Sequence, residues 1–291
     1  MNKILITGHS GFLGRFLVDN LVQNNLIVKL GRSINSDIIL DLSTEIPTFN
    51  EKFNLVIHCA GLAHTDIGDF QKVNVQGTRN LLLGLKKFST THFVFISSVS
   101  VYGKIEGSYL TEKSPLLATD EYGLSKIYAE SELIKWCKSQ NVVCTILRLP
   151  LVVGNNPPGN LGKMIVAIRK GYYINIAGGK ARKSMVFAED VAKFIIAASK
   201  VGGIFNLTDG EHPSFKQLSS FIAKQVGRNW ILNIPFKMAL VLAWIGGNLG
   251  NNFPLNTRKL NKITSDLTFD DSLAREKFDW NPRPIIPNFK L

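Results

Sequence analysis

The chain has 291 residues, of which 45% are hydrophobic and 19% charged, a balance typical of a globular protein with a substantial core and not of a disordered or fibrous chain. Its 34 Lys and Arg against 22 Asp and Glu leave a formal charge of +12, which favours anionic partners such as dinucleotides, nucleotide sugars, nucleic acid or acidic lipid. The basic residues are scattered and are not interleaved with aromatic residues, so we expect no nucleic-acid partner.

The cysteines and histidines give no sign of a disulfide framework or a metal site. Cys59, Cys137 and Cys144 form neither a CxxC motif nor a zinc-ligand spacing, and the five histidines show no ligand spacing either. The strand-like run at 3–7 leaves no room for a secretory signal. We therefore expect a cytoplasmic protein without a bound metal.

Short apolar runs bounded by turn residues alternate with segments of helical periodicity through the first half of the chain. This alternation predicts an α/β fold of the Rossmann type, a doubly wound parallel sheet covered by helices. The predicted strands are residues 3–7, 26–30, 55–59, 93–97 and 142–149.

The glycine-rich turn Thr7-Gly-His-Ser-Gly-Phe-Leu-Gly14 lies directly between the first predicted strand and the first helix. There Gly8 permits a tight turn, Gly11 lets the backbone approach a pyrophosphate, and Gly14 lets helix and strand pack closely. The helix N-terminus offers N–H groups to the same anion. The motif therefore predicts a nicotinamide dinucleotide bound on these glycines, with Phe12 and Leu13 in the same turn.

The end of the second predicted strand indicates which dinucleotide is preferred. An acidic residue at this place hydrogen-bonds the ribose 2′-OH of NAD, whereas Arg accommodates the 2′-phosphate of NADP. This chain has Leu30-Gly-Arg-Ser33, so Arg32 and Ser33 favour NADP over NAD. The alternative is that Arg32 stacks on the adenine or faces solvent.

Tyr122 and Lys126 are four residues apart and are therefore expected on one face of a helix. A tyrosine, with an ordinary pKa of about 10, is a poor base at neutral pH until a neighbouring cation lowers that pKa. We predict that Lys126 has this effect on Tyr122. Ser97 and Ser98, at the end of the fourth predicted strand, complete a candidate catalytic group.

The pattern changes after residue 149, where Gly154-Asn-Asn-Pro-Pro-Gly159 predicts a loop and later elements are shorter and less regular. We predict a dinucleotide-binding domain at 1–150 and a smaller, mixed substrate-binding region at 151–291. A helix at 187–199 and a strand at 204–207 are expected to return to the main sheet, so 186–210 belongs with the first domain.

Residues 230–250 are mostly apolar but are interrupted by Asn233, Pro235 and Lys237. The uninterrupted part, 238–245, is far shorter than the roughly 20 residues of a transmembrane helix, so no membrane span is predicted. We interpret the segment as a helix that is buried or covers a groove. A helix that lies on a membrane surface is the alternative.

Taken in order, these motifs resemble those of the extended short-chain dehydrogenase/reductases, and specifically the NAD-dependent nucleotide-sugar epimerases and dehydratases. The resemblance spans nearly the whole chain. The sequences that carry it are TGHSGFLG (7–14), Asp41-Leu42, HCAGLAH (58–64), NVQGT (74–78), SSVSVYG (97–103), YGLSK (122–126) and RLPLVVG (148–154).

The resemblance implies a role for each matching residue. Ser98 would hydrogen-bond the reacting hydroxyl, Tyr122 would act as acid and base, and Lys126 would bind the nicotinamide ribose. Lys183 stands where the family has a diphosphate-binding Arg, so either Arg182 takes that role or the phosphate is held differently. The further implied contacts are Asp41 and Leu42 at the adenine, Ala60 and Gly61 at the pyrophosphate, Asn74 near the ribose, and Ser100, Asn160 and Leu161 at the substrate.

The resemblance also narrows the reaction. Val99-Ser100 replaces the Asp-Glu pair of the 4,6-dehydratases, and Ser100 replaces the Cys of the 3,5-epimerising reductases. What remains is a 4-epimerase or a 4-ketoreductase of a UDP-linked hexose for surface polysaccharide, and Arg32 favours the reductase because a consumed cofactor is more often NADPH. A homodimer is expected. The alternative function is a catalytically silent regulatory protein that binds dinucleotide on the same fold.

Overall fold

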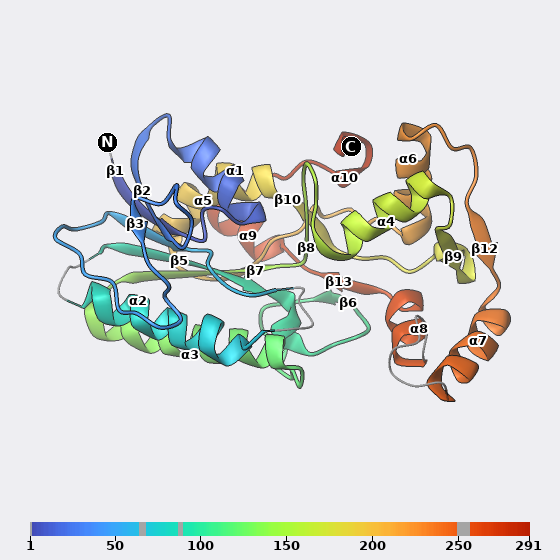
Figure 1. Ribbon diagram of the computed structural model, residues 1–291, viewed down its shortest axis with the longest axis horizontal. Coiled ribbons are helices and arrows are strands. Elements are labelled where there is room, and N and C mark those ends of the chain that lie inside the picture. Colours follow the sequence, from blue (N-terminus) through green and yellow to red (C-terminus); the bar gives the residue numbers. More distant parts are fainter. Residues whose placement is uncertain (1, 64–67, 87–89, 249–256) are drawn as a thin grey trace.

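The computed structural model describes residues 2–63, 68–86, 90–248 and 257–291. Its centre is a seven-stranded sheet in the order β11-β7-β5-β4-β1-β2-β3 (Figure 1), and every pair in it is parallel. The α/β, Rossmann-type prediction is therefore confirmed. The strands are β1 (Asn2–Thr7), β2 (Asn25–Gly31), β3 (Ile38–Ile39), β4 (Leu55–His58), β5 (His92–Ser98), β7 (Val143–Leu149) and β11 (Gly203–Asn206).

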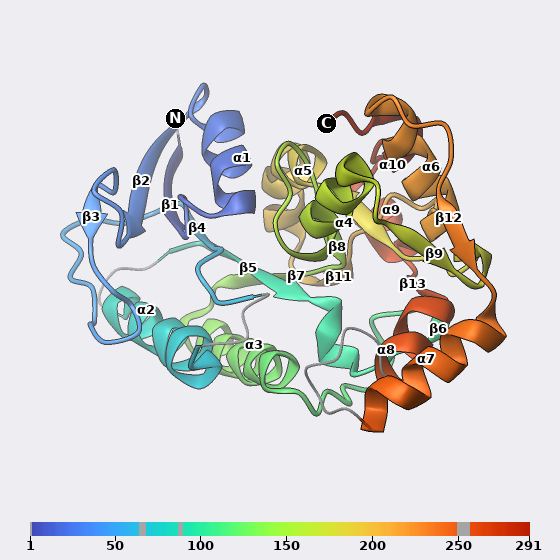
Figure 2. The ribbon, with the colours of Figure 1, turned by 45° about the vertical axis from the view of Figure 1, so that its right-hand side comes forward.

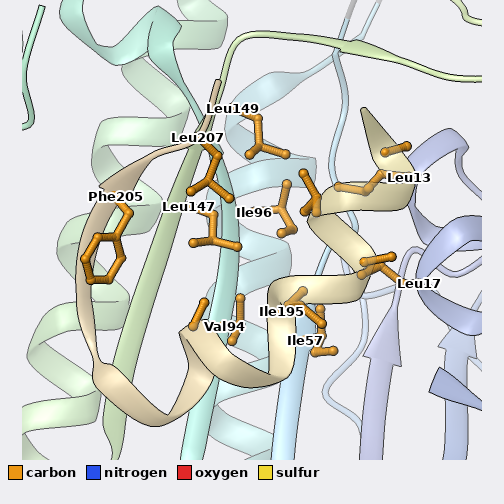
Figure 3. Close-up of a cluster of buried hydrophobic side chains, with 14 of the residues drawn as sticks. Leu13, Leu17, Ile57, Val94, Ile96, Leu147, Leu149, Ile195, Phe205 and Leu207 are labelled. Atoms are coloured by element: carbon orange, nitrogen blue, oxygen red, sulfur yellow. The ribbon is translucent and has the colours of Figure 1, made fainter. Parts of the chain in front are cut away.

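Helices cover both faces of this sheet, which is why its strands are apolar on both sides. On one face lie α1 (Phe12–Leu21), α5 (Ala188–Val201) and α9 (Ser272–Phe278), and on the other lie α2 (Gly77–Leu85) and α3 (Glu121–Gln140) (Figure 1). In the first layer Leu17 of α1 and Ile195 of α5 pack against Ile57 and Val94 of the sheet (Figure 3). Both layers hold the carboxyl ends of the strands in fixed register.

The order of the strands reverses at β1. The chain passes from β1 to β2 on one side and later places β4 on the other side. In doubly wound sheets ligands bind at such a reversal, outside the carboxyl ends of the strands. Thr7, His58 and Ser98 end β1, β4 and β5 at this edge, so the edge is where the candidate site is built.

The second half of the chain forms smaller units beside the sheet (Figure 2). Leu161, Ile165, Phe187 and Ile222 share a separate apolar cluster. The elements of these units are α4 (Gly159–Lys170), α6 (Phe215–Gln225), α10 (Ile285–Asn288) and the two-stranded pairs β8 (Leu151–Val153) with β10 (Met185–Phe187) and β9 (Ile174–Ile176) with β12 (Leu232–Ile234). A third pair joins β6 (Gly107–Leu110), from the first half of the chain, to β13 (Leu267–Phe269).

The chain returns to the central sheet after this excursion. β11 pairs with β7 from Gly203–Thr145 to Asn206–Arg148, and α5 packs on α1. These contacts involve the segment expected to rejoin the first domain, while the division of the chain at residue 150 stays a prediction.

Two further helices, α7 (Phe236–Asn248) and α8 (Thr257–Thr264), lie at the outer end of the second half (Figures 1 and 2). The expectation of a buried or groove-covering helix at 238–245 is wrong for the described side chains, because Met238, Val241 and Trp244 are all more than half exposed. Within the described residues, no helix is both long and apolar enough to cross a membrane.

Candidate active site

The glycine turn between β1 and α1 is as tight as the sequence predicts. Gly8 has a φ of +71°, and a Cβ there would lie 2.5 Å from the backbone nitrogen of Ala60. A Cβ on Gly14 would lie 2.1 Å from the carbonyl oxygen of Gly8. No side chain fits at either position, so the glycine turn packs backbone to backbone against the loop after β4 at Gly8 and against α1 at Gly14.

Gly11 differs from the other two glycines, because the protein itself leaves it room. A Cβ there would contact only the Gly8 carbonyl, at 3.2 Å, and its φ of −72° suits any residue. It is the N-cap of α1, yet no side chain caps that helix and no acidic residue lies in its first turn. Unpaired N–H groups beside a bare backbone surface fit the pyrophosphate of a dinucleotide.

At the end of β2 the structure places Arg32 and Asp41 together. The Arg32 side chain is 76% exposed, and its Nη1 lies 3.8 Å from Oδ2 of Asp41. The N–H of Ser43 holds the pKa of Asp41 below its ordinary value, and Arg32 contributes to the same shift. A carboxylate therefore does reach the end of β2, from the β3 side, which the sequence of β2 alone does not reveal.

Ser33 and His9 shape the same corner. Ser33 accepts hydrogen bonds from the backbone of its own turn, from Asn35 to its hydroxyl and from Ser36 to its carbonyl. His9, inside the glycine turn, lies with Nε2 2.8 Å from the Ser36 hydroxyl. Burial, with a smaller effect from Lys29, lowers the pKa of His9, so a neutral imidazole is favoured there.

The candidate catalytic hydroxyls meet where β5 ends and α3 begins. The Ser98 hydroxyl accepts a hydrogen bond from the backbone N–H of Ser100 at 3.1 Å. It also lies 3.1 Å from the Ser100 hydroxyl. Tyr122 is in the first turn of α3, whose N-cap Asp120 accepts the N–H of Gly123 at 3.0 Å. Phe70 packs on the Tyr122 ring with centroids 5.8 Å apart, which restrains the ring.

The predicted lowering of the Tyr122 pKa by Lys126 is wrong for this structure. Burial raises the pKa of Tyr122 above its ordinary value, the hydrogen bond with Ser98 opposes that shift, and electrostatic interactions with Asp120 and Cys59 add to it. Helical spacing puts Lys126 on the same side of α3, but burial disfavours the phenolate and Lys126 is not among the groups that shift this pKa. The N-terminal dipole of α3 remains available to favour negative charge on Tyr122.

Lys126 is buried, and the protein rather than solvent surrounds its ammonium group. Nζ donates to the carbonyl oxygen of Ile96 at 3.0 Å and lies 4.8 Å from the centre of the Phe95 ring. Burial lowers the pKa of Lys126 to about 8, while Cys59 and Glu130 oppose the shift. A Cβ on Gly61 would come within 3.4 Å of Nζ, so this glycine keeps the approach to the ammonium open.

Asn74 organises the loop that carries Ala60 and Gly61. Its Oδ1 accepts the N–H of Leu62 at 2.7 Å, and its Nδ2 donates to the hydroxyl of Ser125 at 2.9 Å. Asn74 is 2% exposed. It therefore fastens the loop after β4 to α3.

A buried ion pair lies one helical turn beyond Lys126. Arg148 of β7 forms two hydrogen bonds with Glu130 of α3, from Nη2 to Oε2 at 2.7 Å and from Nε to Oε1 at 3.1 Å. Both side chains are 3% exposed. Ser97 also donates to Glu130, and Tyr102 receives the second arm of Arg148. This network fixes α3 against β5 and β7.

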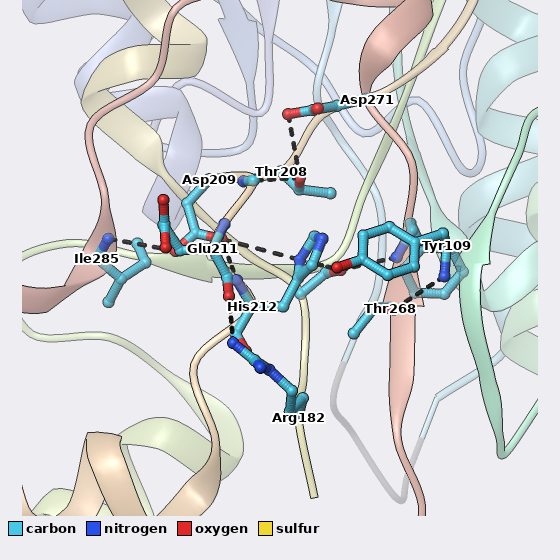
Figure 4. A network of polar contacts seen from close by, with 12 residues as sticks. Tyr109, Arg182, Thr208, Asp209, Glu211, His212, Thr268, Asp271 and Ile285 are labelled. Atoms are coloured by element: carbon cyan, nitrogen blue, oxygen red, sulfur yellow. Dashed lines mark hydrogen bonds and ion pairs between the residues drawn. The ribbon is translucent and has the colours of Figure 1, made fainter.

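The two cations expected at the substrate diphosphate, Arg182 and Lys183, both donate hydrogen bonds to backbone carbonyl groups. Arg182 donates to the carbonyl oxygens of His212 and Glu211, each at 3.0 Å (Figure 4), and Lys183 donates to that of Ser265 at 2.8 Å. Burial, together with the charge of Lys262, lowers the pKa of Lys183 to about 8. A bound anion would offset the repulsion between Lys183 and Lys262. Lys183 is therefore a stronger candidate than Arg182 for binding a diphosphate.

Several residues implied by the resemblance cannot offer their side chains to a ligand. Leu13, Leu42 and Leu161 are at most 7% exposed and belong to apolar clusters. Leu13, Leu42 and Leu161 could therefore contact a cofactor or substrate only through their backbone atoms. Phe12 is partly buried against the same core, whereas Asn160 is exposed in the first turn of α4.

Two of the hollows among the described residues lie in the second half of the chain. One, of about 370 Å³, is lined by Gly159, Gly162, Lys163, Val166 and Tyr172, next to Asn160. The other, of about 130 Å³, lies beside Arg182 and is lined by Asp209, Glu211, Pro213, Gln217 and Ile286. Neither of these two hollows is lined by Ser98, Tyr122 or Lys126.

Sequence reasoning missed two neighbours of the catalytic group. Cys59 directly follows β4, and its thiol interacts electrostatically with both Tyr122 and Lys126. Burial raises the pKa of Cys59 to about 11, so it stays a neutral thiol. Its position after the apolar run 55–58 was the available signal. Phe70, which packs on Tyr122, carried none, because it follows a loop without periodicity.

The fold and this edge of the sheet define a dinucleotide-binding Rossmann protein. Residues 4–207 match the family model described as the NAD dependent epimerase/dehydratase family. The match covers more than half of the chain, and the chain therefore belongs to that family. The family resemblance expected from the motifs is confirmed.

Individual relatives point the same way. The chain is 32% identical to the UDP-glucose 4-epimerase of Dictyostelium discoideum, over 99% of this chain and 97% of that protein. It is 29% identical to a decarboxylating sterol-4-alpha-carboxylate 3-dehydrogenase of the same organism, over 96% of each. The crystal structure of the UDP-N-acetylglucosamine 4-epimerase from Bacillus cereus shares the fold, with a TM-score of 0.75, 22% identity and coverage of 97% and 94%.

Proposed function

We propose that this protein is a dinucleotide-dependent oxidoreductase that acts on C4 of a UDP-linked hexose, as a 4-ketoreductase rather than a 4-epimerase. Family membership and the relatives support an NAD-dependent enzyme of the epimerase/dehydratase type. The observation that carries the finer proposal is the group formed by Ser98, Tyr122 and Lys126 at the carboxyl edge of β5, beside the glycine turn.

Each residue of the group has a proposed task. The nicotinamide, when bound, supplies hydride chemistry and lies against Lys126, which Gly61 leaves accessible. Tyr122 moves the proton of the C4 oxygen, and Ser98 holds that oxygen by a hydrogen bond. Lys183 and Asn160 bind the nucleotide diphosphate. Lys262, which lowers the pKa of Lys183 through charge repulsion, adds a second positive charge that favours an anion near Lys183.

The reductase and the epimerase differ in what happens to the cofactor. An epimerase returns hydride to the same sugar and keeps its dinucleotide, whereas a reductase consumes a reduced one. We expect purified protein to oxidise NADPH when a UDP-4-keto-hexose is added. We also expect it not to interconvert UDP-GlcNAc and UDP-GalNAc without added cofactor. Interconversion without added cofactor would assign the epimerase instead.

The preference for NADP rests on Arg32. We expect Arg32→Ala to weaken NADP binding roughly ten- to a hundredfold, the effect of losing a hydrogen bond to a charged group of about 1.5–3 kcal/mol, and to leave NAD binding within about twofold. Isothermal titration with each dinucleotide measures this. Arg79→Ala is the matched control, because Arg79 is also exposed and paired with a carboxylate. Equal losses for NAD and NADP would contradict the assignment.

Two broader expectations accompany this function. A cytoplasmic site is proposed because Cys59, Cys137 and Cys144 are all free thiols. A homodimer is proposed from the resemblance alone. The catalytically silent alternative predicts dinucleotide binding without turnover, and the tyrosine variant discussed below separates it from the enzyme.

A further inference from the structure

The second half of the molecule exposes large apolar side chains that nothing in the described chain covers. We call this the α7 surface. Trp230 is 75% exposed and Trp244 is 69% exposed. Isolated exposed hydrophobic residues are normal in folded proteins, whereas a group of them marks a contact surface. The α7 surface consists of Trp230, Leu232, Phe236, Met238, Leu240, Val241 and Trp244, which are all exposed.

Helix α7 leaves its large apolar side chains exposed because the face that packs on the protein consists of alanines. Ala239 and Ala243 are fully buried against Leu260 of α8, with Ile234 and Ile263 beside them. A helix that is apolar around its whole circumference is normally buried on all sides. Here only the alanine side is packed, and α7 lies at the outer end of the molecule next to α8 (Figure 2).

The charge of this part of the chain is one-sided. Residues 212–265 contain seven Lys and Arg and no Asp or Glu. Lys237 within α7 and Lys262 within α8 are both exposed. Residues 151–291 have 19 of the 34 basic and 9 of the 22 acidic residues, which leaves +10 of the net +12 in this half. The α7 surface therefore sits in a strongly positive environment.

We propose that the α7 surface docks on an anionic lipid bilayer, with α7 lying in the plane of the membrane interface. Tryptophan and aliphatic side chains enter the boundary between headgroups and acyl chains, while flanking lysines attract acidic headgroups. A second copy of this chain is a poorer occupant, because pairing would bring two basic, carboxylate-free stretches together. The inference does not depend on the reaction proposed above.

The test uses the full-length protein and vesicles of phosphatidylcholine, either pure or with phosphatidylglycerol as about a third of the lipid to supply an anionic surface. We expect cosedimentation with the anionic vesicles, weaker binding to pure phosphatidylcholine, and release as salt is raised. Val241→Ser with Trp244→Ser should reduce partitioning at least about tenfold. Ile34→Ser is the control, because Ile34 is 86% exposed on another part of the surface and should not matter.

The variants remove exposed side chains, and circular dichroism verifies that they remain folded. Lys237→Glu with Lys262→Glu should abolish the preference for anionic vesicles and leave any binding to phosphatidylcholine unchanged. Wild-type protein that stays in the supernatant with anionic vesicles would overturn the proposal. Light scattering could also overturn it, by showing that the wild type is a dimer and the Val241/Trp244 variant is a monomer. A second copy of the chain would then occupy the α7 surface.

Discussion

Replacing Tyr122 with phenylalanine is expected to lower turnover by roughly 10²- to 10⁴-fold, the range for loss of a general acid–base group, and to leave dinucleotide affinity unchanged. The substitution removes only the hydroxyl. The ring keeps its packing on Phe70, at a centroid distance of 5.8 Å, and the helix keeps its Asp120 cap. Steady-state kinetics with the substrate identified by the reductase and epimerase assays, together with titration of the cofactor, measures both quantities.

Tyr128 provides the matched control for this variant. It lies on the same helix as Tyr122 but is 49% exposed, so Tyr128→Phe should behave like the wild type. Turnover by Tyr122→Phe within about twofold of the wild type would exclude the proposed proton transfer. A wild type that binds dinucleotide but turns over neither substrate would favour the catalytically silent alternative.

Replacing Arg148 with methionine is expected to lower the free energy of unfolding by about 3–5 kcal/mol, the typical cost of leaving a buried charge without its partner. Glu130 would lose two of its hydrogen bonds, at 2.7 and 3.1 Å, in a place where both side chains are 3% exposed. Urea denaturation followed by circular dichroism gives the difference.

A more exposed ion pair, which joins α2 to α3, supplies the comparison. Arg79 and Glu132 lie 2.9 Å apart with side chains 48% and 33% exposed, so Arg79→Met should cost at most about 1 kcal/mol. Similar losses for the two variants would show that Glu130 is not isolated from solvent. A double variant, Glu130→Gln with Arg148→Met, should regain part of the stability, because it leaves no unpaired buried charge.

The fold was predictable because its signals are local. Every predicted strand of the central sheet appears within one residue at each end, since buried parallel strands require continuous apolar runs. The two-residue β3 and the two-stranded pairs outside the central sheet were not predicted. These short strands lack a clear apolar run bounded by turn residues, and they exist because distant segments supply their partners.

The helix at 236–248 shows the opposite case. Its apolar composition is that of a buried helix, but composition does not reveal which neighbours the rest of the chain provides. Among the described residues its contacts are limited to the alanine face, which packs on Leu260 of α8 with Ile176 and Ile234 beside it. The sequence therefore predicted the helix-like apolar segment correctly and its burial wrongly.

The amino-acid sequence by itself determined the glycine turn, the catalytic residue types and the alternation that makes a Rossmann sheet, because these depend on spacing along the chain. Only the tertiary structure decided their surroundings. It buried Tyr122, so that its pKa rises, directed Lys126 to the Ile96 carbonyl, and brought Asp41 to Arg32. Desolvation and charge pairing depend on residues far apart in sequence, and folding alone sets those distances.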